Sequence, residues 1–111
     1  MALKITPVKQ ATWAPFEHEG CVNVEYKSFL RRDGRVALAM LRFGKRATIH
    51  EHPADIDVDV ICLEGEGFTS VVAEQAPIQA GQRVHWPAGK PHCLWTENSE
   101  MITLMVEHLK D

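Results

Sequence analysis

The spacing of glycine and proline residues constrains the fold most strongly, because these residues cut the chain into short segments. The residues between the breaks are rich in β-branched and other strand-favouring types. No long run combines apolar residues at three- and four-residue spacing with capping residues, so no helix is predicted. Many short strands joined by Gly and Pro turns are typical of a small β-sandwich or barrel. The sequence therefore predicts an all-β fold.

The positions of the strands follow from alternation and from runs of apolar residues. Strands are expected at 22–30, 35–43, 57–63, 68–73, 83–86, 92–96 and 101–108, together with a strand that carries His50 and His52. Turns are expected at 31–34, 44–46, 64–67 and 97–100. The segment 35–43 is almost wholly apolar, which predicts that both of its faces are covered.

The size and composition of the chain predict one hydrophobic core. It has 111 residues, of which 45% are hydrophobic, enough for a single ordinary domain. We therefore expect one domain over residues 1–111, with an irregular N-terminal arm over about 1–20 and a barrel core over about 35–107. Trp13 and Phe16 are expected to pack this arm onto the domain, because both are large aromatic side chains.

Charge and hydropathy exclude several classes of protein. The formal net charge is −3 and no basic block occurs, so neither nucleic acid nor a membrane is an expected partner. No apolar run approaches the length of a membrane span, and the start of the chain has no apolar signal region. The three cysteines form no paired spacing, which fits a reducing compartment. We expect a cytoplasmic protein.

Three histidines form the candidate functional site. His50 and His52 are separated by one residue, and such residues share a face of a strand. His92 follows a turn that contains Pro87, Gly89 and Pro91, whose rigidity would aim the imidazole at one place. Three neutral imidazoles at about 2.0–2.1 Å make an open site for one divalent transition metal. Imidazole ligands leave Fe, Zn, Ni, Mn and Cu all open.

These histidines lie in two runs that resemble the two motifs of the cupin superfamily. The first run contains Gly44, His50, His52 and Gly65, and the second contains Gly81, Pro87, Gly89 and His92. The second run departs at its last position, where Thr96 replaces the usual Asn. The resemblance covers most of the chain and implies a cupin-type double-stranded β-helix, that is, a jelly-roll barrel. It implies a metal held by His50, His52 and His92.

The first run departs from the family at its acidic ligand. Counting forward from His52, the usual Glu position falls on Asp57, whereas counting back from Gly65 it falls on Val58. Two models follow: Asp57 is a shorter fourth ligand, or the site has three histidines and Val58 lines the pocket. The second is preferred, and it would resemble the three-histidine dioxygenases that cleave diketones and thiols. Asp57 or Asp59 could act as a general base if one faces inward.

The remaining candidates have structural interpretations. His85 and His108 are expected to be surface or ordinary strand residues. Residues expected to line the barrel interior or an interface are Met40, Arg42, Phe43, Trp86, Trp95, Met101 and Met105. An apolar strand that leaves a sheet edge open predicts a homodimer, and small cupins are similar in commonly dimerising through such strands.

The function expected from these features is that of a metal-binding cupin, a metalloenzyme of oxygenase, isomerase or lyase type that acts on a small organic molecule held in the barrel. The alternative is a non-catalytic cupin that binds or senses a small ligand. A third, weaker interpretation is a structural or interaction protein in which the histidines have no metal.

Overall fold

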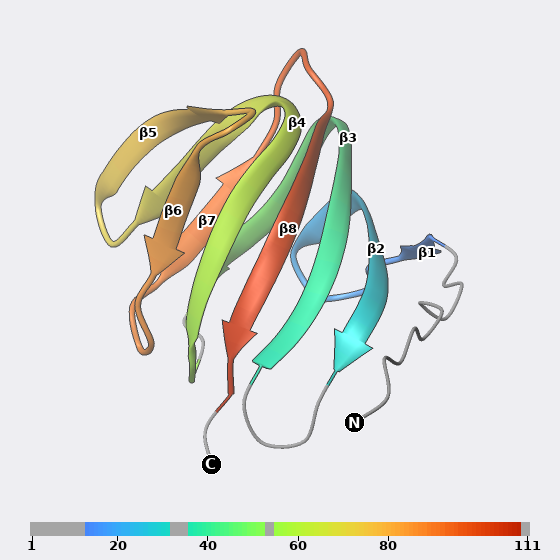
Figure 1. Cartoon of the computed structure of the whole chain (residues 1–111). Helices are drawn as coiled ribbons and strands as arrows, with labels where there is room; N and C mark the ends of the chain where they lie inside the picture. Colours follow the sequence, from blue (N-terminus) through green and yellow to red (C-terminus); the bar gives the residue numbers. More distant parts are fainter. Residues whose placement is uncertain (1–12, 32–35, 53–54, 110–111) are drawn as a thin grey trace.

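The computed structural model describes residues 13–31, 36–52 and 55–109, without the side chains of 28–31 and 50–52. Within these residues every regular element is a strand, as the sequence predicts (Figure 1). The strands are β1 (Ala14–Pro15), β2 (Cys21–Arg31), β3 (Val36–His52), β4 (Asp57–Val71), β5 (Glu74–Gln79), β6 (Arg83–Trp86), β7 (His92–Trp95) and β8 (Met101–His108). The expected turn at 31–34 extends beyond the described residues.

Two long strands, β3 and β4, each pass from one layer of the fold to the other (Figure 1). Residues 36–43 of β3 pair with β8, whereas its end pairs with β7. Residues 57–65 of β4 pair with β8, and residues 66–71 pair with β5. One layer therefore has the order β2-β3-β8-β4-β6 and the other has the order β3-β7-β4-β5, with all pairs antiparallel. This arrangement is a jelly-roll barrel.

Two expected turns are wrong, because the chain bends there without leaving the strand. The turn expected at 44–46 lies inside β3, where Arg46 has a φ of 55°. The turn expected at 64–67 lies inside β4, where Gly65 has a φ of 78°. A residue with positive φ sharply redirects the backbone, and the strand continues when both of its halves find partners. The bends are the points where β3 and β4 change layer.

The shorter strands agree more closely with the sequence. The expected strands at 83–86 and 101–108 coincide with β6 and β8. The strand expected at 22–30 is one residue shorter than β2 at each end, and the one expected at 92–96 is one residue longer than β7. No strand is expected at 74–79, where Pro77 interrupts a segment in which three of the six residues are polar. Proline is tolerated there because β5 is an edge strand that pairs only with β4 among the described strands.

The hydrophobic core fills the space between the two layers. Its largest fully buried side chains are Phe43, Val60, Cys62, Leu94, Met101 and Thr103. Phe16 packs against this core, and its backbone N–H donates to Val24. The Trp13 ring lies 4.4 Å from the Arg42 guanidinium and 5.1 Å from the Lys27 ammonium. Both aromatic residues therefore pack the arm onto the barrel, as predicted.

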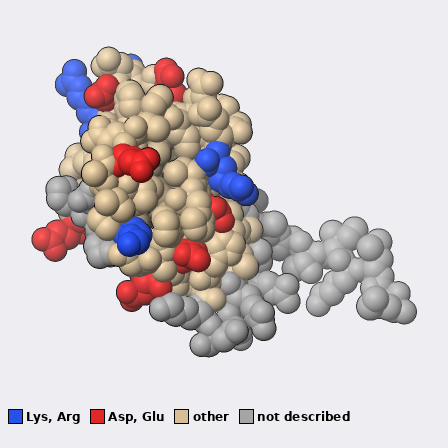
Figure 2. Space-filling view, turned by 90° about the vertical axis from the view of Figure 1, so that its left-hand side faces the viewer, with Lys and Arg blue, Asp and Glu red and all other residues tan. Residues whose placement is uncertain are grey.

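The side of the barrel that carries β5 and β6 shows isolated charges of both signs between uncharged surface (Figure 2). No helix among the described residues is long and apolar enough to cross a membrane.

Candidate metal centre

His92 is the first residue of β7 and lies on the interior face of the barrel. Only 2% of its surface is exposed. Its Nδ1 lies 3.3 Å from the carbonyl oxygen of Lys90. Because a carbonyl oxygen only accepts, Nδ1 carries the proton in this contact, and the Nε2 lone pair is the one that suits a metal. The turn before His92 contains Gly89 at a φ of 78°. This turn leads directly into β7, the strand that carries the imidazole.

The backbone register places His52 opposite His92. Further along the same pair of strands Ile49 faces Leu94, and both are buried in the core. The pairing shifts by one residue between Ile49 and His52. Without this bulge the register from Ile49 would pair Glu51, and not His52, with His92. His50 lies within the bulge. The side chains of His50 and His52 lie outside the described residues.

The acidic ligand considered from the sequence does not lie inside the barrel. The Asp57 side chain is 52% exposed, and its Oδ1 accepts a hydrogen bond of 2.7 Å from the Ala88 N–H. Val58 is 6% exposed and belongs to the core. Alternation along β4 therefore puts Val58 on the interior face and Asp57 on the outer face. Asp57 instead ties the start of β4 to the turn before His92.

Asp59 also lies on the outer face, so neither carboxylate considered as a general base faces the interior. Its Oδ1 lies 3.0 Å from His85 Nδ1, and its Oδ2 lies 2.8 Å from His108 Nε2. The pKa of the Asp59 carboxyl lies below its usual 3.8, chiefly because His108 donates a hydrogen bond to it. Partial burial opposes this shift. The hydrogen bond from His85 and the charges of both histidines lower the pKa further. His85 and His108 are exposed, as predicted.

Two residues that support His92 were not assigned this role from the sequence. Trp86 stacks on the imidazole with ring centroids 4.0 Å apart and planes 12° apart. Its indole N–H donates to Thr69 Oγ1 at 3.1 Å, and that hydroxyl donates to the Cys93 carbonyl at 3.0 Å. From the sequence, Trp86 is expected only to line the interior or an interface. For Thr69, alternation along its strand could have predicted an inward side chain, but nothing in the sequence indicates its partner.

The other lining candidates divide between the two faces. Phe43, Met101 and Met105 belong to the core with Trp86. Arg42 lies on the outer face and bonds Glu25 at 2.8 Å, and Trp95 stacks on Phe68 with centroids 5.7 Å apart. Trp95 alternates with the buried His92 and Leu94, so it lies on the outer face of its sheet.

Among the residues with described side chains, no group of three or more His, Cys, Asp or Glu is placed to hold a metal ion. That set includes His92 but neither His50 nor His52. The features that fit a metal are therefore the burial of His92, its Nδ1 contact with a carbonyl, and its register opposite His52.

Comparison with family models and with curated proteins finds no match. Solved structures do match. The polyketide cyclase RemF from Streptomyces resistomycificus is 14% identical, with a TM-score of 0.83 over 96% of this chain and 80% of that one. An RmlC-like cupin from Shewanella frigidimarina is 14% identical, with a TM-score of 0.80 over 97% and 92%. KdgF from Halomonas sp. is 13% identical, with a TM-score of 0.78 over 90% and 89%.

These likenesses, together with the two-layered barrel, define the class of this protein: it has the fold of a small cupin. At these identities they define the fold alone.

Proposed function

We propose that this protein is a metal-binding cupin in which His50, His52 and His92 hold one divalent transition metal inside the barrel. The observation that carries the proposal is the register of His52 opposite the buried His92. Residues that face each other across an antiparallel pair lie on the same face of the sheet. Nδ1 of His92 donates to Lys90, which fixes the tautomer with Nε2 as the ligand nitrogen.

We infer that the protein is a metalloenzyme of oxygenase, isomerase or lyase type acting on a small organic molecule. A bound metal would supply Lewis acidity toward a substrate oxygen or, if it is iron, a site for dioxygen. The chain itself would supply an apolar, water-poor interior, since Val58, Leu94 and Met105 are among the buried core residues. Polyketide cyclase chemistry is named for one structural neighbour, and it belongs in the substrate panel.

The alternative is a cupin that binds or senses a small ligand without turnover. It is favoured by one observation: Asp57 and Asp59 lie on the outer face, so neither is available as a general base inside. A panel of diketones, thiols, sugar derivatives and polyketide-like phenols separates the two functions. Product formation supports the enzyme, whereas a ligand-induced rise in melting temperature without product supports the binding module.

The metal proposal is tested by elemental analysis of protein purified without added metal and then loaded with Co²⁺. Wild type is expected to retain about one equivalent, as a single site requires. His92→Ala and His50→Ala should lose it. His85→Ala is the matched control, since His85 lies on the outer face. Full metal content in a His50→Ala/His92→Ala double variant would show that the ion is held elsewhere.

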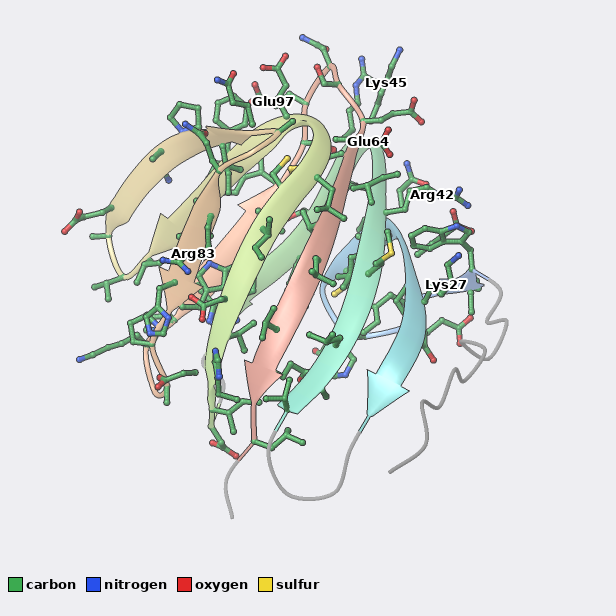
Figure 3. The ribbon with its side chains drawn as sticks, viewed as in Figure 1. Lys27, Arg42, Lys45, Glu64, Arg83 and Glu97 are labelled. Atoms are coloured by element: carbon green, nitrogen blue, oxygen red, sulfur yellow. The ribbon has the colours of Figure 1, made fainter. Side chains whose placement is uncertain are left out.

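We further propose a homodimer formed through the outer face of the β3-β8-β4 sheet. Met40, Leu104 and Ile61 lie side by side there, because Leu104 pairs with both of the others. Lys27 and Arg83 flank this row on β2 and β6 (Figure 3). An apolar centre with a charged rim is the usual anatomy of an interface. Sedimentation should give a dimer at micromolar concentration and a monomer for Leu104→Glu.

A further inference from the structure

The imidazole of His92 is held from one side by a stacked indole. The ring planes of His92 and Trp86 are 12° from parallel with centroids 4.0 Å apart, and both residues are 2% exposed. A stacked partner covers the face of an imidazole and leaves its two nitrogens, which lie on the ring edge, open to bonding. Rotation of the imidazole out of this plane would drive its edge into the indole.

The indole is itself fixed at its polar end. Its N–H donates to Thr69 Oγ1 at 3.1 Å, and the Thr69 hydroxyl donates to the Cys93 carbonyl at 3.0 Å. Thr69 is buried, so this hydroxyl is the partner that satisfies a buried indole donor. Cys93 is the residue after His92 on β7. The contacts therefore form a closed circuit from the imidazole through Trp86 and Thr69 back to the strand that carries His92.

This circuit joins the two layers of the barrel. Trp86 ends β6, which pairs with the first half of β4, whereas Thr69 lies in the second half of β4, which pairs with β7. The indole that stacks on the imidazole is thus held by elements of both sheets. Such partners behind a ligand set its orientation, and losing them typically weakens metal affinity about 10–100-fold.

We propose that Trp86, anchored by Thr69, is a positioning residue that fixes the ring plane of His92, and so keeps its Nδ1 on the Lys90 carbonyl in the tautomer that leaves Nε2 for metal coordination. The proposal rests on the metal-binding function proposed above, and it adds two residues that do not touch the metal. It predicts that the ring stack and the hydrogen bond from the indole N–H to Thr69 Oγ1 both contribute to the affinity for the metal. Thr69→Val removes the anchor at constant shape, and Trp86→Leu removes both the stack and the anchor.

The first measurement is Co²⁺ affinity by titration of the visible absorption of the bound ion, with stability followed by urea unfolding. We expect Trp86→Leu to bind Co²⁺ at least tenfold more weakly than wild type, and Thr69→Val several-fold more weakly. Phe43→Leu is the control, because Phe43 is an equally buried core aromatic; it should lose stability and keep its affinity and spectrum. Wild-type affinity in both Trp86→Leu and Thr69→Val would overturn the proposal.

The second measurement needs no metal, so it separates this proposal from the metal function. At one fixed pH, the ¹⁵N shifts of the His92 ring in the metal-free protein report which nitrogen carries the proton. Wild type should show a single Nδ1–H tautomer, and Trp86→Leu and Thr69→Val a mixture. If wild type binds no Co²⁺, the metal function fails while this readout still decides the positioning role: an unchanged tautomer in a folded Thr69→Val overturns it, even if Trp86→Leu does not fold.

Discussion

His52 and His92 face each other across β3 and β7, although a large part of the chain separates them in sequence. A one-residue bulge after Ile49 produces this pairing. Because side chains alternate along a strand, a single extra residue exchanges the two faces for every position beyond it. The bulge therefore sets the backbone register in which His52, and not Glu51, is paired with His92.

Metal binding should raise the melting temperature of the protein. A metal that binds only the folded state stabilises it by about 2.7 kcal/mol at one hundred times its Kd. For a chain of this size that corresponds to a rise of about 10 °C or more. Calorimetry with Co²⁺ and then with excess EDTA should show the rise and its reversal in wild type and His85→Ala. An equal, EDTA-reversible rise in His92→Ala would contradict the assignment of His92.

Thr96 joins β7 to the bend of β3 through three hydrogen bonds. Its N–H donates to the Ala47 carbonyl, and its Oγ1 accepts from the Ala47 N–H and donates to the Gly44 carbonyl. Thr96→Val keeps the shape and the backbone bond but removes both bonds of the hydroxyl, to the Ala47 N–H and the Gly44 carbonyl. We therefore expect a loss of about 1–3 kcal/mol in the free energy of unfolding. Urea unfolding measures it. Thr48→Val is the control, since among the described residues the Thr48 hydroxyl has a single contact, at 3.9 Å from the Cys93 sulfur.

A loss in Thr96→Val no larger than in Thr48→Val would show that the hydroxyl of Thr96 is not what holds the bend. The comparison also bears on the motif itself. Thr96 stands where the cupin motif usually has Asn, and the structure shows how a threonine at this position bonds both sides of the β3 bend.

The sequence predicted which residues form strands better than it predicted where strands end. Alternation located β6 and β8, and the two cupin motifs indicated the barrel. Gly65 was interpreted as part of a turn, because a positive φ serves a hairpin turn and a strand bend equally well. Only the partners of residues 66–71, which lie on β5 and β7, distinguish the two.

The inward or outward position of the acidic residues could not be decided from the sequence for a related reason. Asp57 and Asp59 share parity with each other, but β3 ends at His52 and β4 begins at Asp57, so no continuous strand relates their faces to that of His52. Stacking between Trp86 and His92 is a contact across layers, and no local pattern encodes it. Strand parity could have placed Trp86 inside, since it alternates with the exposed His85.

Gly65→Ala should destabilise the protein more than Gly81→Ala. Both glycines have positive φ, 78° and 89°, so each alanine carries backbone strain of about 1 kcal/mol. At Gly65 a Cβ would also overlap the carbonyl oxygen of Glu100, whereas at Gly81 it would meet nothing within 4 Å. We expect about 2–4 kcal/mol for Gly65→Ala by urea unfolding, since strain and overlap add. Equal losses of unfolding free energy at the two positions would show that the start of β8 moves to accommodate the Cβ at residue 65 without destabilising the protein.

The carboxylate of Asp59 should make stability depend on pH in the acid range. Its pKa in the folded protein lies below its usual 3.8, chiefly because His108 donates to it, with a further contribution from His85 and an opposing one from burial. A lowered pKa means that the folded state favours the ionised form. The stabilisation is therefore complete above about 3.8 and is lost as the pH falls through the lower folded value.

Asp59→Asn removes this charge at constant shape, so its effect should itself depend on pH. Near pH 6 we expect the variant to be less stable by about 0.5–1 kcal/mol, the upper range for charge pairs with exposed partners. The difference in unfolding free energy between wild type and Asp59→Asn should narrow as the pH is lowered from 4 to 2. It should also shrink in 1 M salt, which screens the interactions of Asp59 with His85 and His108. Asp55→Asn, at an exposed position, is the control in the same urea series. A gap that stays constant from pH 6 to pH 2 would show that the Asp59 carboxylate gains nothing from His85 and His108, and that the cluster on the outer face contributes through packing alone.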